Sequence, residues 1–267
     1  MHEIKSVMFD LAGTLCSLSG LKLPFNNFLT EFVGTFGVQA EPEDIEVSYA
    51  TGLMNSFLTV GKQSYYLHDD LFAQAIKNFL GFHNVNSYTD EDIRFALKNQ
   101  RELTIGSIKV RSAVHKTLQL LRDRGIKIAV VSNIDEDYFH PMLEKLELTD
   151  KADVFLSSQA AKSCKPDQAI FLKGLELINL SSNSGSTISA PETIFVGDTP
   201  FADIKGANSV SMVSVLLKTS TMKAVSNLSG ESKPDWLISS VDQILDIVDS
   251  FSVDPQENLL GNQTGKP

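Results

Sequence analysis

A short apolar run near the start of the chain is the feature that most restricts its fold. Val7, Met8 and Phe9 are too few for a helix and fit a strand that is buried on both faces, as in a parallel sheet. Asp10 ends the run, and Gly13 allows the chain to turn sharply soon after it. A carboxylate at the carboxyl end of such a strand faces the crevice in which open α/β sheets bind ligands. The sequence therefore predicts a site around Asp10.

Strand and helix patterns alternate in the second half of the chain. Apolar runs at 126–131, 154–156, 193–196 and 210–217 are typical of strands, and amphipathic stretches between them are typical of helices. Repeated strand–helix units imply a parallel sheet with right-handed crossovers. We therefore predict an α/β fold built on a parallel sheet.

Residues 16–108 show a different pattern. Aromatic and aliphatic residues recur at helical spacing on one face over 25–36 and again over 69–80. Thr89, which is followed by three acidic residues, is a helix start signal. The segment is therefore predicted to be an all-helical insertion after the first strand. We interpret its aromatic residues as the core of a helix bundle rather than as a cofactor site.

Charge and cysteine content argue against several classes of protein. The net charge of −10 and the sequence pI of about 5.0 disfavour binding to nucleic acid or to anionic membranes. No apolar run has the length of a membrane span, and no signal-peptide pattern precedes the first strand. The two cysteines, Cys16 and Cys164, are too few for a disulfide framework. We therefore expect a cytoplasmic protein without nucleic-acid or membrane partners. The sequence does not predict its oligomeric state.

Polar residues at the ends of the predicted strands form a set suited to phosphoryl transfer. Asp10 can attack phosphorus and form an aspartyl phosphate. Asp10 and Asp198 offer the hard oxygen ligands that Mg²⁺ prefers. Thr14 and Ser132 carry hydroxyls that can hold phosphoryl oxygens, and Lys165 can neutralise developing negative charge.

Four segments, in this order, resemble the motifs of the haloacid dehalogenase (HAD) superfamily. They are residues 9–15 (Phe-Asp-Leu-Ala-Gly-Thr-Leu), 131–133 (Val-Ser-Asn), 165–167 (Lys-Pro-Asp) and 196–203 (Val-Gly-Asp-Thr-Pro-Phe-Ala-Asp). The agreement in order and spacing extends over roughly residues 4–250. A chance match of four ordered motifs is improbable, so the chain resembles this superfamily specifically.

The resemblance implies an α/β protein with a Rossmann-like parallel sheet core and an inserted α-helical C1 cap domain. The core domain would comprise residues 1–15 and 109–250, and the cap domain residues 16–108. Residues 251–267 lack periodicity and are predicted to form a mobile tail.

The resemblance also implies the function and the roles of individual residues. It implies Mg²⁺-dependent hydrolysis of a small phosphorylated metabolite, with Asp10 as nucleophile and Lys165 as a second catalytic residue. The implied metal ligands are Asp10, the backbone carbonyl of Ala12 and Asp198. The implied phosphate-binding residues are Thr14, Ser132, Asn133 and Lys165. Asp203 would hold a ligand or Lys165 in place, or would begin the following helix.

Ala12 departs from the family pattern, because most HAD phosphatases carry a second aspartate at this position. That aspartate would protonate the leaving group and later activate water. Loss of a general acid–base group typically costs about 10²–10⁴-fold in rate. One interpretation is that the chain is a phosphatase that uses water or another acid in place of this aspartate. Equally, the chain could be an engineered phosphatase in which Ala12 replaces a native aspartate.

Two further interpretations are open. Residues 10–14 resemble the first motif of phosphonoacetaldehyde hydrolase, which cleaves a C–P bond after a cap lysine forms a Schiff base. Lys62 is the candidate lysine, although a lysine in place of Asn55 would resemble that family's cap more closely. Alternatively, the chain is a catalytically impaired HAD fold that binds a phosphorylated ligand or a partner. Dehalogenases fit less well, because they dispense with Mg²⁺ whereas this chain keeps the acidic fourth motif.

Overall fold

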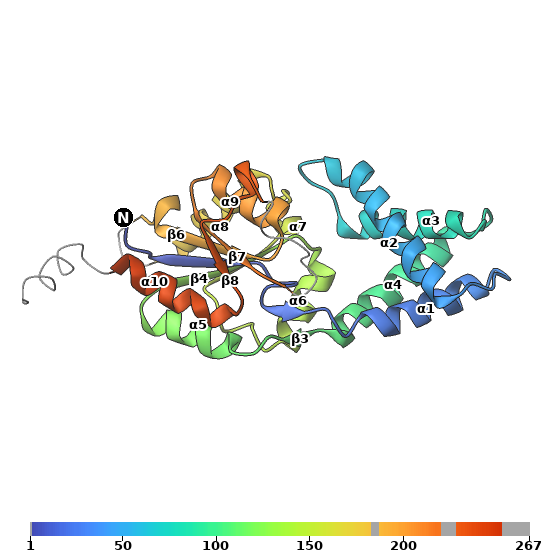
Figure 1. Cartoon of the computed structure of the whole chain (residues 1–267), viewed down its shortest axis with the longest axis horizontal. Helices are drawn as coiled ribbons and strands as arrows, with labels where there is room; N and C mark the ends of the chain where they lie inside the picture. The colour runs from blue at the N-terminus through green and yellow to red at the C-terminus, as the bar shows by residue number, and fades with distance from the viewer. Residues whose placement is uncertain (1, 183–186, 220–227, 253–267) are drawn as a thin grey trace, which may run out of the picture.

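A six-stranded parallel sheet forms the centre of the protein (Figure 1). The computed structural model describes residues 2–182, 187–219 and 228–252. The strand order is β5-β4-β1-β6-β7-β8, so β1 lies between two neighbours and is buried on both faces, as its apolar sequence predicts. The strands are β1 (Ser6–Phe9), β4 (Lys127–Ser132), β5 (Val154–Ser157), β6 (Thr193–Gly197), β7 (Val213–Leu217) and β8 (Trp236–Ile238).

Helices cover both faces of this sheet. Val7 and Phe9 belong to the core cluster formed with α5, α6 and α10, whereas Met8 belongs to the cluster formed with α8 and α9. Successive residues of β1 therefore point into two different cores, which explains why Val7, Met8 and Phe9 are all apolar. The flanking helices are α5 (Val114–Asp123), α6 (Glu136–Lys145), α7 (Ser158–Ala161), α8 (Gln168–Ser181), α9 (Lys205–Ser209) and α10 (Ile244–Ser252). Shorter turns are η2 (Ala190–Glu192), η3 (Pro200–Ile204), η4 (Gly230–Ser232) and η5 (Val241–Gln243).

Four further helices gather at one end of the molecule, beyond the sheet (Figure 1). They are α1 (Lys22–Gly34), α2 (Pro42–Thr59), α3 (His68–Phe82) and α4 (Asp90–Ser107), with the short turn η1 (Val60–Lys62) between α2 and α3. We refer to residues 22–107 as the helical segment. It has a hydrophobic cluster of its own, and α4 begins directly after Thr89, as the sequence predicted. The side chains of Thr89 and Asp92 form a capping box at this start. The division into core and cap domains at the predicted boundaries stays a prediction.

The two connections between the helical segment and the sheet run side by side. β2 (Cys16–Ser17) and β3 (Lys109–Val110) pair as a short antiparallel ribbon. Arg111 follows this ribbon, and its Nε donates to the Gly13 carbonyl at 2.9 Å. The prediction of helix throughout 16–108 is therefore wrong for Cys16 and Ser17, which are extended because they pair with the returning chain.

One local prediction also differs from the structure. The strand expected over 210–217 begins only at Val213, because the preceding residues form the turn after α9. α8 begins at Gln168, two residues after Pro166, and Asp167 caps it by accepting a hydrogen bond from the Ala169 N–H at 2.8 Å. Of the predicted mobile tail 251–267, residues 253–267 lie outside the described part, and the first two residues complete α10. No helix in the described ranges is both long and apolar enough to cross a membrane.

Asp135 joins the sheet to the helical segment. It directly precedes α6, yet its buried carboxylate makes no capping bond to that helix. Instead, it accepts hydrogen bonds from the backbone N–H groups of His68 at 2.9 Å and Asp69 at 2.8 Å. These N–H groups start α3 and have no partner within their own helix, so Asp135 satisfies them and faces the positive helix end. Arg101 of α4 adds ion pairs of 2.8 Å with both Asp69 and Asp137.

We expect Asp135→Asn to lower the free energy of unfolding by about 1.5–3 kcal/mol, the usual range for hydrogen bonds to a charged group. Burial alone would raise the pKa of Asp135, but hydrogen bonds from His68 and Asp69 hold it below its usual value. The stabilisation is therefore present above the unfolded-state pKa and is lost as the pH falls through the lowered folded-state pKa. Wild type should lose more stability than the variant below about pH 4.

Urea unfolding between pH 3 and pH 7 measures this difference. Asp70→Asn is the matched control. Asp70 also places a negative charge at the first turn of α3, but its side chain is exposed. Equal losses of stability in the two variants would show that the Asp135 hydrogen bonds contribute nothing beyond charge.

Candidate active site

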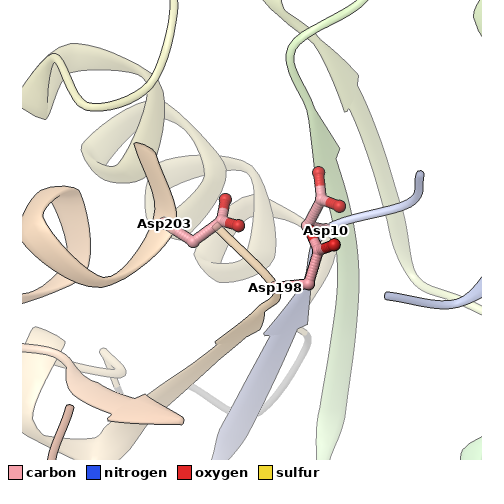
Figure 2. Close-up of side chains that lie close together, drawn as sticks. All are labelled: Asp10, Asp198 and Asp203. Atoms are coloured by element: carbon pink, nitrogen blue, oxygen red, sulfur yellow. The ribbon is translucent and has the colours of Figure 1, made fainter. Parts of the chain in front are cut away.

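Three carboxylates meet at the carboxyl ends of the central strands. Asp10 follows β1, Asp198 follows the neighbouring β6, and Asp203 lies in the helical turn η3. One oxygen from each carboxylate lies within 4.8 Å of the others. Figure 2 shows the three side chains, which come from separate segments of the chain. Parallel neighbours end at the same edge of a sheet, so the strand order explains why residues far apart in sequence converge here.

Two glycines leave room for this cluster. Gly13 has φ +97°, a conformation that side-chain-bearing residues rarely adopt, and a Cβ at this position would collide with the Asp198 carboxylate. A Cβ at Gly197 would collide with Asp203. The turn after β1 and the end of β6 therefore need glycine for the carboxylates to approach each other.

Lys165 lies among these carboxylates and is only 4% exposed. Its Nζ is 2.7 Å from Asp10 Oδ1, 2.7 Å from Asp203 Oδ1 and 3.2 Å from the Val131 carbonyl oxygen. Its three ammonium hydrogens thus have three acceptors. The Ser132 hydroxyl also donates to Asp10 Oδ1, at 3.5 Å. The sequence-predicted residues Asp10, Ser132, Lys165, Asp198 and Asp203 are therefore brought together by the fold.

The pKa values in this cluster follow from burial and from an excess of negative charge. Burial raises the pKa of Asp10 to about 7; the carboxylates of Asp203 and Asp198 add to the rise, and Lys165 opposes it. Burial and the charge of Asp203 raise the pKa of Asp198 to about 6. Burial disfavours the charged form of Lys165, but Asp10 and Asp203 outweigh it and raise the Lys165 pKa.

The cluster fits a divalent cation. It holds three carboxylates against the single ammonium group of Lys165, and Mg²⁺ takes hard oxygen ligands of this kind. Both Asp203 oxygens have hydrogen-bond donors, Lys165 at 2.7 Å and the Thr199 N–H at 2.9 Å. By contrast, Oδ2 of Asp10 and Oδ2 of Asp198 accept no hydrogen bond from the described part of the chain. Asp10 and Asp198 therefore have the oxygens open to a metal, whereas Asp203 holds Lys165.

A cavity of about 1030 Å³ lies beside the cluster, between the sheet and the helical segment. Its lining on the sheet side includes Asp10, Ala12, Ser132, Asn133, Lys165 and Asp203. Lys62, the predicted cap lysine, lies in η1, is exposed and lines the cavity from the helical segment. Ala12 thus lies where a longer side chain could reach the cavity.

Two predicted phosphate-binding residues are placed differently from the others. The Asn133 amide donates to the Lys165 carbonyl at 2.8 Å and accepts from the Lys165 N–H at 2.7 Å, so it holds the lysine backbone. Thr14 is fully buried, and its hydroxyl has no partner among the described residues. Neither Thr14 nor Asp198 is among the residues that line the cavity. The predicted phosphate-binding role of Thr14 and the predicted metal-binding role of Asp198 stay predictions.

Sequence reasoning missed the wall that the helical segment presents to the cavity. Met54, Phe57 and Leu58 of α2 line it, together with Tyr66 and His68. The first three lie at spacings of three and four residues, which would have indicated one helix face. The pattern could not show that this face points toward the carboxylate cluster rather than into the core of the helical segment.

The family model of haloacid dehalogenase-like hydrolases matches residues 4–210 of this chain. The chain is also similar to two curated proteins over nearly their full lengths. It is 27% identical to a phosphoglycolate phosphatase of Pasteurella multocida, over 93% of this chain and 100% of that protein. It is 23% identical to a glyceraldehyde 3-phosphate phosphatase of Methanocaldococcus jannaschii, over 94% of this chain and 100% of that protein.

A comparison of solved structures gives the same fold. A HAD phosphatase from Thermococcus onnurineus superposes with a TM-score of 0.65 over 92% of this chain and 98% of that chain, at 20% sequence identity. At this identity the likeness establishes the α/β fold and leaves the chemistry to be argued from the site.

We expect Lys165→Met to lower the free energy of unfolding by about 3–5 kcal/mol, because it leaves two buried carboxylates facing each other without a cation. Combining it with Asp203→Asn should recover part of this loss, since one of the two charges is then removed. Denaturant unfolding of the single and double variants measures both effects. Lys173→Met is the matched control, because the Lys173 side chain is 43% exposed and pairs with Glu176 near the surface. A Lys165→Met effect as small as that of the control would contradict the assigned importance of the buried pair.

Proposed function

The chain belongs to the haloacid dehalogenase-like hydrolase family, and we propose that it is a Mg²⁺-dependent phosphatase of a small phosphorylated metabolite. The observation that carries this proposal is the buried contact of Lys165 with Asp10 on the wall of the cavity. The similarity to two phosphatases along their entire lengths supports the reaction class.

Asp10 is the proposed nucleophile. Its Oδ1 is held by Lys165 and Ser132, while its Oδ2 accepts no hydrogen bond in the described ranges. Attack of a carboxylate oxygen of Asp10 on phosphorus would form an aspartyl phosphate as the bond from phosphorus to the ester oxygen breaks. Lys165 would hold the carboxylate in its charged form and offset its repulsion by the incoming phosphate. Water would then hydrolyse the aspartyl phosphate and regenerate Asp10.

The metal ligands in this proposal are Asp10, Asp198 and the backbone carbonyl of Ala12. The two open carboxylate oxygens and the excess negative charge support this assignment. Bound Mg²⁺ would supply charge stabilisation for the phosphoryl oxygens. The proposed phosphate-binding residues are Ser132, Thr14 and Lys165. Asn133 and Asp203 are positioning residues: Asn133 holds the backbone of Lys165, and Asp203 holds its ammonium group.

Ala12 leaves the proposed reaction without a proton donor at this position. A phosphatase of this kind must protonate the departing alkoxide, and the methyl group of Ala12 cannot do so. Water in the cavity would have to take this role. The helical segment, as the proposed cap domain, would cover the cavity during the reaction and restrict access of bulk water.

The position of Lys62 supports a test of the alternative function, C–P bond hydrolysis. Lys62 lines the same cavity as Asp10 and Ala12, which is the arrangement that a Schiff-base mechanism would need. That mechanism requires a small residue at position 12, whereas the phosphatase mechanism would benefit from an acid there. The effect of a substitution at Ala12 therefore separates the two alternatives.

We expect phosphate release from a panel of phosphate monoesters that includes phosphoglycolate to require both Mg²⁺ and Asp10. Asp10→Asn should abolish measurable turnover, because an amide oxygen is a poor nucleophile, while the Lys165 contact keeps an acceptor. Asp70→Asn, an exposed change of the same chemistry, should leave the rate unchanged. Turnover that persists in Asp10→Asn, or without any divalent cation, would refute the proposed mechanism.

Ala12→Asp should raise turnover of alkyl phosphates about 10²–10⁴-fold, because it restores a proton donor for the alkoxide. Activated aryl phosphates need less protonation, so formation of the aspartyl phosphate should gain less with them. Pre-steady-state kinetics on both ester types measures the two steps separately, and thermal unfolding checks that the fold is unchanged. Equal alkyl-ester rates in the two proteins would contradict the missing-acid account. Loss of activity in Ala12→Asp would favour the C–P hydrolase.

A further inference from the structure

Three large apolar side chains of α2 line one wall of the cavity and are exposed. Met54, Phe57 and Leu58 lie on one face of α2, and their side chains are 61%, 44% and 56% exposed. All three line the cavity that contains Asp10. Phe57 also packs against the backbone of Gly61, where a Cβ would lie only 3.1 Å from the Phe57 ring. Gly61, in the turn η1 that follows α2, therefore leaves room for the ring.

The sheet side of the cavity also contributes one large, exposed apolar residue. Phe201 follows β6 on the sheet side of the cavity and is 62% exposed. Pro166, next to the buried lysine, and Ala12, two residues after Asp10, are smaller apolar residues in the lining on the same side. Single exposed apolar residues are normal in proteins, but here four large ones line the same cavity from two elements.

The charges on the wall from the helical segment also favour a ligand with an apolar body and a phosphate group. Among the described residues that line the cavity, this wall contributes no acidic side chain, and its lysine is Lys62. A two-carbon ester such as phosphoglycolate would occupy only a small part of about 1030 Å³ and would leave the apolar wall in water. Burying that wall needs a ligand with apolar surface of its own.

We propose that the cavity binds phosphate monoesters whose alcohol part is an apolar body of about four or more carbons, covered by Met54, Phe57, Leu58 and Phe201. This inference rests on the proposed function, because the phosphate end of such a ligand must reach Ser132 and Lys165. The apolar body then lies between α2 and Phe201, and the alcohol part rather than the phosphate decides which ester binds.

Binding of alkylphosphonates, which have no ester bond to hydrolyse, tests the inference without relying on catalysis. Calorimetry in the presence of Mg²⁺ should show affinity that rises about fourfold per methylene from methyl- to hexylphosphonate. The heat-capacity change of binding should become more negative along the series. Inorganic phosphate gives the baseline for the phosphate end alone.

Substitutions in the wall should remove the dependence on chain length. Leu58→Asn and Phe57→Ala should weaken hexylphosphonate binding by about tenfold or more and change methylphosphonate binding less than twofold. Leu23→Asn is the matched control, because Leu23 is 71% exposed on α1 and does not line the cavity. Equal affinity along the series would overturn the inference. Equal weakening of hexylphosphonate and methylphosphonate binding would also overturn it. The apolar residues of α2 would then only pack against Phe201 and would not contact the alkyl chain of the ligand.

The two proposals can fail separately. If Asp10-dependent phosphate release occurs but phosphonate affinity does not depend on chain length, the apolar ligand is excluded and the phosphatase stands. If affinity depends on chain length and on Leu58 while no ester is hydrolysed, the apolar binding site stands and the phosphatase does not.

Discussion

The ammonium group of Lys165 is the contact on which the site depends. Burying a carboxylate costs several kcal/mol unless it is paired, and this site buries Asp10 and Asp203 and partly buries Asp198. Lys165 reaches two of them at 2.7 Å and can compensate no more. The raised pKa values of Asp10 and Asp198 reflect this shortfall, because burial and mutual repulsion outweigh the lysine. The cluster is therefore suited to a further cation, and it would repel a phosphate group in the absence of one.

The backbone around Lys165 also connects the carboxylate cluster to the helical segment. Asn133 bonds both backbone groups of Lys165, and the N–H of the adjacent Cys164 donates to the Ser64 carbonyl at 2.7 Å. If the helical segment swings about the β2–β3 ribbon, the contacts of Cys164 and Asp135 must break, whereas those of Asn133 need not. The ion pair between Lys165 and Asp10 can therefore persist while the cavity opens.

Sequence reasoning was most successful where the fold follows from strand ends. Asp10, Ser132 and Asp198 each follow an apolar run, and parallel pairing of those runs forces them to one edge of the sheet. Lys165 was identified by its motif, but its burial between two carboxylates could not be derived, because it depends on the path of a loop.

Side-chain direction is what the sequence left undetermined. Asp135 directly precedes α6, a position from which an aspartate commonly caps a helix, yet its carboxylate bonds to α3 instead. The face of α2 that carries Phe57 shows the same limit. Its apolar spacing is equally consistent with packing inside the helical segment, and only the position of α2 against the sheet directs it toward the cavity.

Under the proposed function, the apolar wall and Ala12 favour the same kind of leaving group. An alkyl ester releases an alkoxide that needs a proton, and position 12 offers none. A phenolic leaving group has a pKa near 10, so it departs with far less help from an acid. Its ring is also the kind of body that Phe57 and Phe201 can cover, because aromatic pairs gain from contact beyond the area that they bury. An aryl phosphate therefore meets both constraints at once, whereas a small polar alkyl phosphate meets neither.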